Sequence, residues 1–174
     1  MKAPRSLKAR ALQYLAQREH SRLELRRKLL PHARSEVEAA LAAAADAPAL
    51  RAAAPVDTAP DRVEAVLDWL EAHAYLSQER FVESRVHARA ARFGNLRIRQ
   101  ELKQHALALP AEMAQALRSS ELERARAVRE RKFGALPVDA AGRARQARFL
   151  MGRGFSPDTI HQALRDAGIV PDED

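Results

Sequence analysis

Apolar residues recur every three or four positions through most of the chain, with charged residues between them. This spacing matches the period of an α-helix with one apolar face. No window alternates β-branched or aromatic residues with polar ones between hairpin turns, as a half-buried strand would. The pattern therefore predicts an all-α protein.

Capping residues set the boundaries of the predicted helices. The segments that begin at Ser21 and Ser120 both have the Ser-x-x-Glu spacing of a capping box, and Ser156 precedes a proline suited to the first helical position. Gly168 has the place of a left-handed C-terminal cap. We predict helices at residues 7–18, 21–31, 35–46, 60–73, 77–92, 95–105, 110–119, 120–133, 139–151 and 156–167.

A weak internal repeat is visible when the segments around three turns are aligned. Ser21 aligns with Ser156, and the preceding His20 with Phe155, while the middle copy keeps Phe93-Gly94. Chance similarity between amphipathic helices is the alternative, but the cap and the core positions stay in register without a gap. Units this small cannot bury their own apolar faces, so we expect tandem three-helix repeats stacked in an elongated, curved arrangement.

These repeats predict three divisions of the chain. The first helical repeat covers residues 1–76, the second 77–119, and the third 120–174 with an acidic C-terminal tail. Residues 47–59, APALRAAAPVDTA, combine prolines with no apolar period. We expect this stretch to be a flexible insertion in the first repeat.

Composition argues against several kinds of chemistry. The chain has no cysteine, and none of its six histidines lies in an HExxH pair or four residues from another histidine. Gly152-Arg153-Gly154 lacks the preceding strand and the following Lys-Ser/Thr of a phosphate-binding loop. We therefore expect no enzymatic activity, no metal and no cofactor. Because no apolar run suits a signal peptide or a membrane span, we also expect a cytoplasmic protein without a membrane partner.

Positive charge is divided into blocks along the chain. The net charge is +7. Residues 5–34 and 81–103 are rich in Lys and Arg, whereas most of the charged residues at 35–80 are acidic. In the helix predicted at 77–92, Arg85, Arg89 and Arg92 form a basic edge beside an apolar stripe. Guanidinium groups bind phosphates and carboxylates alike, so this pattern leaves DNA and an acidic protein surface open as partners.

Five segments resemble motifs of RecX proteins. Residues 18–29, REHSRLELRRKL, are similar to RHS-x-x-EL-x-x-KL, with Glu19 as an extra residue, and residues 94–102, GNLRIRQEL, to G-x-x-RI-x-x-EL. Residues 75–82, 131–134 and 149–155 resemble the YLDDxRFA, K-[YF]-G and FLxxRGF elements. The matches follow the family order over nearly the whole chain. Departures are Pro31-His32-Ala33 in place of a Gly-Phe turn and Ser77-Gln78 in place of Asp-Asp.

The resemblance implies a regulator of the RecA recombinase. Such a protein lies in the groove of the RecA–DNA filament and limits ATP hydrolysis and strand exchange, hence recombination and the SOS response. Expected partners are the RecA filament and single-stranded or filament-bound DNA, and we expect a monomer. Motif positions nominate Arg26, Arg97, Arg99 and Arg153 as protein- or DNA-binding residues, and the basic edge adds Arg85, Arg89 and Arg92. Lys103, four residues after Arg99, and Arg148, in an arginine-rich stretch without acids, complete the set.

Two alternatives accompany these assignments. Arg97 and Arg153 could each hold a turn by bonding carbonyl groups at a helix C-terminus. The chain could also be a stand-alone basic DNA-binding protein of the helix-turn-helix type, which would show operator preference. No predicted helix carries the Asn/Gln/Arg combination at base-contacting spacing, and this favours the filament regulator.

Overall fold

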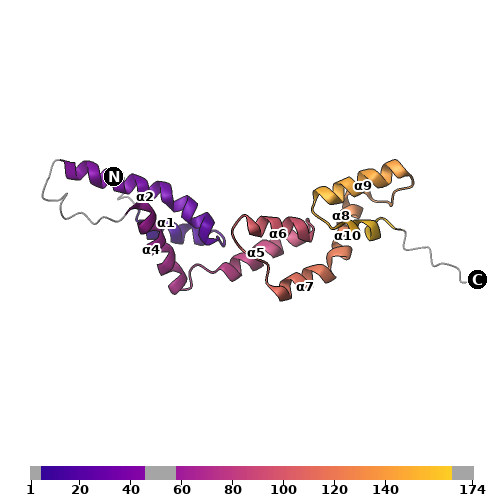
Figure 1. The fold of residues 1–174 in the computed structure, drawn as a ribbon, viewed down its shortest axis with the longest axis horizontal. Coiled ribbons are helices and arrows are strands. Elements are labelled where there is room, and N and C mark those ends of the chain that lie inside the picture. The colour runs from indigo at the N-terminus through magenta and orange to yellow at the C-terminus, as the bar shows by residue number, and fades with distance from the viewer. Residues whose placement is uncertain (1–4, 46–57, 166–174) are drawn as a thin grey trace, which may run out of the picture. The chain divides into compact units, whose positions relative to one another are not determined.

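The computed structural model describes residues 5–45 and 58–165, and these ranges contain helices but no strand. This confirms the all-α prediction. The helices are α1 (Leu7–Leu15), α2 (Arg22–Ala45), α4 (Ala59–Ala72), α5 (Gln78–Ala90), α6 (Asn95–Lys103), α7 (Ala111–Ser119), α8 (Glu121–Phe133), α9 (Ala140–Gly152) and α10 (Pro157–Ala163). Figure 1 labels these helices and colours them from the N-terminus to the C-terminus. The predicted insertion at 47–59 and the cap at Gly168 lie outside the described residues, apart from Thr58 and Ala59.

The chain forms two compact units, residues 1–81 and 82–174. In the first unit α1, α2 and α4 enclose one core. Leu25 and Leu29 of α2 and Leu67 of α4 are all fully buried in it. Thr58 begins α4 with a capping box, because its hydroxyl accepts from the Asp61 N–H while the Asp61 carboxylate accepts from the Thr58 N–H.

The predicted break between helices 21–31 and 35–46 is wrong, because α2 runs without interruption through Pro31. Proline removes one backbone hydrogen bond, and the residue before it disfavours helix. Here Pro31 is exposed, so the carbonyl it leaves unpaired faces solvent. Leu25, Leu29 and Ala33 lie on the opposite face and are fully buried in the core shared with α4. Burial on both sides of the proline keeps the helix continuous.

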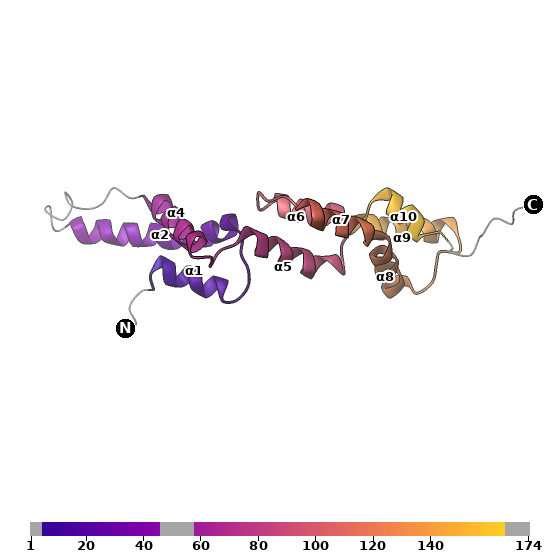
Figure 2. The ribbon, with the colours of Figure 1, turned by 90° about the horizontal axis from the view of Figure 1, so that it is seen from below.

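The second unit contains most of α5 and all of α6–α10. α8, α9 and α10 pack around Ala125, Leu150, Phe155 and Ile160. α6 lies beside α5 in both ribbon views (Figures 1 and 2). The boundary between the two units falls inside α5, and the second unit holds both of the later predicted repeats. The division into three repeats therefore stays a prediction.

Two of the three predicted serine caps form. Ser21 and Ser156 each accept a hydrogen bond from the backbone N–H three residues later, as predicted. The predicted cap at Ser120 is wrong. Ser120 has helical backbone angles, and its hydroxyl donates back to the Ala116 carbonyl at 2.9 Å, so α7 leads almost directly into α8. The neighbouring Glu121 is turned toward other elements instead.

Candidate functional site

The basic edge predicted on α5 is only partly free. Arg85 and Arg89 are half-buried, whereas Arg92 is exposed and follows the end of the helix. Arg89 donates from Nε to Glu101 Oε2 on α6 at 2.9 Å. Because that carboxylate neutralises part of the edge, Arg89 links α5 to α6 as well as contributing positive charge.

A hollow of about 340 Å³ lies between α5 and α6. Three candidate residues, Arg85, Arg89 and Arg97, line it together with Glu101. Arg97 Nε lies 3.6 Å from Glu101 Oε1, so the carboxylate that pairs with Arg89 also faces Arg97. The remaining lining residues are Gln100, Gln104 and His105. The hollow is therefore polar, with an excess of positive charge.

Phe93 brings several predicted residues together. The guanidinium carbons of Arg89, Arg92, Arg97 and Arg153 lie 5.5, 5.7, 5.4 and 5.8 Å from the centre of its ring. Such cation–π contacts offset part of the repulsion between like charges. The sequence placed Phe93 at the turn of the middle repeat, whereas the structure makes it the centre of an arginine cluster.

The other candidates divide into exposed and paired residues. Arg99, Lys103 and Arg148 are exposed, and none forms an ion pair within the described ranges. Arg26 belongs to the first unit, where its Nε donates to Glu64 Oε1 of α4 at 2.5 Å. Arg26 thus joins α2 to α4 and is not among the arginines around Phe93.

The alternative role of holding a turn fits Arg153 but not Arg97. Arg153 does bond a carbonyl near a helix end, because its Nη1 donates to Arg92 O at 3.3 Å just beyond α5. Its guanidinium also stacks 4.6 Å from the centre of the Phe149 ring. Arg97 instead faces Glu101, as described above. Arg153 is therefore fixed in orientation while still contributing charge to the surface.

Arg124 is the most connected arginine that sequence reasoning missed. From α8 it donates to the carbonyls of Ala90, Phe93 and Leu117 at 3.1, 2.8 and 2.9 Å, and to Asn95 Oδ1 at 2.6 Å. Burial lowers the pKa of Arg124, although the Glu121 carboxylate opposes this effect. Its only sequence signal is the spacing of three residues from Glu121, which places both side chains on one face of α8.

Glu121 supplies the cap that the start of α6 lacks. The N-cap of α6 is Gly94, which has no side chain, and Glu121 Oε1 accepts from the Asn95 N–H at 2.8 Å. Its other oxygen accepts from the hydroxyl of Thr159 in α10 at 3.1 Å. One carboxylate thereby connects α6, α8 and α10, which explains why a charged residue is buried here.

Two motif glycines meet at the same junction. The Gly94 N–H donates to Arg153 O at 2.9 Å, and the Leu96 N–H donates to Gly154 O at 3.1 Å. A Cβ on Gly94 would lie 2.2 Å from Gly154 O, and Gly154 itself has a φ of +79°. The glycines therefore permit a backbone contact between the turn before α6 and the turn before α10.

Within residues 5–45 and 58–165, no cluster of His, Asp and Glu side chains could hold a metal ion. No helix in this part of the chain is long and apolar enough to cross a membrane.

Comparisons with known proteins identify the family. Residues 119–164 match a family model described as RecX, third three-helix domain. A regulatory protein RecX from Ralstonia nicotianae is 46% identical over 98% of this chain and 93% of the relative. Proteins of the same name from Leptothrix cholodnii and Chromobacterium violaceum are 48% and 36% identical, each covering 97% of this chain and 94% of the relative. The chain therefore belongs to the RecX family of regulatory proteins.

Proposed function

We propose that this protein binds the groove of the RecA–DNA filament and inhibits its ATPase and strand-exchange activities, and hence modulates recombination and the SOS response. The observation that carries the proposal is the group of four arginines around Phe93, which joins residues from α5, α6 and the turn before α10 into one basic surface. A filament presents both phosphates and acidic protein side chains, and arginine binds either.

Three exposed residues of the second unit are further candidate contacts. Arg99, Lys103 and Arg148 have no ion-pair partner in the described ranges, so each has donors available for a polyanion. Contacts of this kind do not require the protein to recognise individual bases. The protein acts as a cytoplasmic monomer in this proposal, with the RecA filament and its DNA as partners.

The test is ATP hydrolysis by the cognate RecA on single-stranded DNA, with this protein titrated in at fixed salt. We expect suppression at substoichiometric amounts. The variant Arg85→Glu/Arg89→Glu/Arg92→Glu should need at least about ten-fold more protein, since three charge-assisted contacts become repulsive. The charge-matched control Arg126→Glu/Arg143→Glu/Arg145→Glu replaces exposed arginines that form no ion pair within the described ranges and do not lie around Phe93.

Equal loss of potency in both variants would assign the effect to net charge and count against the arginine cluster as the interface. No suppression by the unmodified protein, together with operator-dependent binding to bare duplex DNA, would favour the stand-alone helix-turn-helix alternative.

A further inference from the structure

A second pocket adjoins the arginine cluster, because Arg92 and Arg153 belong to both. Its volume is about 250 Å³, and it is lined by Arg92, Val128, Arg131, Lys132, Phe149 and Arg153. Four of the six lining residues are cations and none is an acid. The hollow between α5 and α6 differs, because Glu101 faces its arginines.

The positive charge of this pocket is not neutralised within the described ranges. Arg131 and Lys132 are exposed in the last turn of α8 and form no ion pair there. Arg92 contributes only a cation–π contact with Phe93. Gathering four cations around one small pocket costs electrostatic energy that a bound anion would recover.

Arg153 forms a preorganised wall of the pocket. Its guanidinium is held over the Phe149 ring at 4.6 Å, and Nη1 is bonded to Arg92 O. A side chain already held in place loses little conformational entropy when it binds a ligand. Val128 and Phe149 provide an apolar surface beside the cations.

We propose that this pocket binds a single DNA strand, with a phosphate on its cations and the adjoining sugar or base against Val128 and Phe149. Cations from three separate segments beside an apolar surface match the alternation of phosphate and uncharged nucleoside along a strand. The pocket is smaller than the range of about 300–1,000 Å³ that encloses free small molecules, so part of a polymer suits it better. This inference rests on the proposed function, because the strand is the DNA of the filament.

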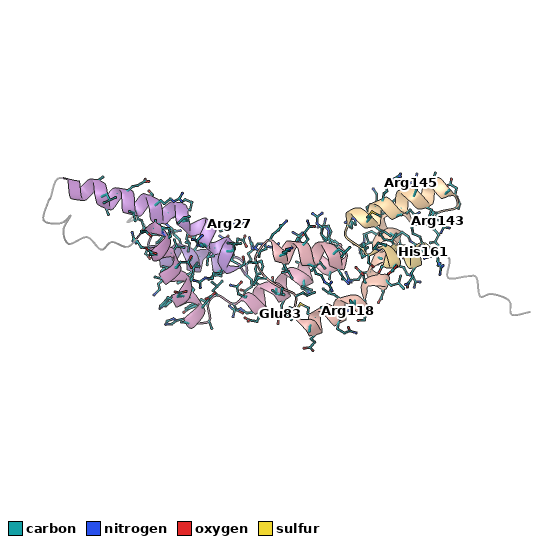
Figure 3. The ribbon with its side chains drawn as sticks, viewed as in Figure 1. Arg27, Glu83, Arg118, Arg143, Arg145 and His161 are labelled. Carbon is teal, nitrogen blue, oxygen red and sulfur yellow. The ribbon has the colours of Figure 1, made fainter. Side chains whose placement is uncertain are left out.

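The test measures binding of the full chain to a fluorescein-labelled oligothymidylate by fluorescence anisotropy over a range of salt concentrations. The variant Arg131→Gln/Lys132→Gln removes two pocket cations. The control Arg143→Gln/Arg145→Gln removes the same charge from α9 residues that do not line the pocket and are labelled in Figure 3. Circular dichroism checks that both variants keep their helices, and Lys132→Gln alone serves if the double pocket variant unfolds.

We expect the pocket variant to bind at least about ten-fold more weakly at low salt. The slope of log K against log salt should become shallower by about 0.7, since each phosphate contact to a single strand contributes about 0.7 and the pocket holds one phosphate. The control should retain most of its affinity. Equal weakening of both variants, or of neither, would overturn the proposal. Displacement of the strand by polyglutamate at matched charge concentration would also overturn it, by making an acidic protein segment the ligand.

The RecA assay separates the two proposals. If the pocket variant loses strand binding while the unmodified protein fails to suppress the ATPase, the pocket assignment stands and the filament function fails. If the unmodified protein suppresses the ATPase while the pocket variant binds DNA normally, the filament function stands and the pocket assignment fails.

Discussion

Replacing Gly94 by alanine should destabilise the second unit, because the new methyl group has no room. Its Cβ would lie 2.2 Å from Gly154 O, 2.3 Å from Phe155 N and 2.4 Å from Gly154 C. All three are backbone atoms, so no side-chain rotation can relieve the overlap. The turn before α10 must move away from α6 instead.

The magnitude follows from the interactions that this movement breaks. The two backbone hydrogen bonds that join these turns contribute about 1 kcal/mol each, and displacing packed backbone costs roughly another 1–3 kcal/mol. Gly94 has a φ of −77°, which alanine adopts without strain. Alanine also lowers the conformational entropy of the unfolded chain, and this offsets about 0.4–1 kcal/mol of the lost stability. We expect a net destabilisation of about 2–5 kcal/mol.

The matched control is Gly152→Ala. Gly152 is the last residue of α9, has no atom within 4 Å of an added Cβ, and has no positive φ. Because alanine has the higher helix propensity, this variant should be unchanged or more stable by up to about 1 kcal/mol. The pair separates the close contact at Gly94 from a general effect of replacing glycine.

Urea unfolding monitored by two probes tests the prediction. Circular dichroism reports helices in both units, whereas fluorescence of the single tryptophan, Trp69, reports the first unit. Gly94→Ala should shift the dichroism transition to lower urea and leave the Trp69 transition nearly unchanged. A Gly94→Ala protein as stable as Gly152→Ala would refute the close approach of the two turns.

Three further predictions address single side chains. Arg124→Met should lower the free energy of unfolding by about 2–4 kcal/mol because five hydrogen bonds are lost, whereas Arg126→Met, at an exposed position of the same helix, should have little effect in the same urea titration. Arg22→Met should lower the free energy of unfolding by about 1 kcal/mol at low salt and by less in 1 M NaCl, because Arg22 pairs with Glu64, Asp68 and Glu71 at 2.6 Å each. A destabilisation that salt does not reduce would contradict an ionic origin. His20→Phe should abolish the fall in stability that accompanies a drop in pH below 6.5, measured as melting temperature against pH; an unchanged pH dependence would show that His20 does not titrate on unfolding.

The sign of the His20 effect follows from its environment. Burial, together with the Arg18 charge, lowers the pKa of His20 below its ordinary value of 6.5, although Glu24 opposes this. The unfolded chain therefore binds more protons than the folded chain as the pH falls below 6.5. Stability is present above that pH and is lost below it. Phenylalanine suits the position because Phe93 and Phe155 precede the equivalent turns.

Much of this fold was predictable because local rules act within a few residues. The apolar period located the helices, and Ser21 and Ser156 marked helix starts through hydrogen bonds to residues only three positions away. The motif order also indicated the family. These features depend on backbone geometry and on neighbours along the chain, which the sequence records directly.

Long-range contacts decided the remaining features. Pro31 reads as a helix break, yet burial of Leu29 and Ala33 against α4 keeps α2 continuous. Glu121 reads as an ordinary residue in the first turn of the helix predicted at 120–133, but it caps α6, twenty-six residues earlier in the chain. Arg89 and Arg26 read as free basic residues, although each faces a carboxylate on another helix.

The basic surface shows the same division between sequence and structure. Helical spacing predicted a basic edge of arginines on α5, and the resemblance to family motifs nominated Arg97 and Arg153. Only the tertiary structure gathers Arg89, Arg97 and Arg153 around Phe93, because the contact between Gly94 and Gly154 brings those segments together. A helical period specifies which face a residue occupies, whereas the partner of that face depends on how separate helices pack.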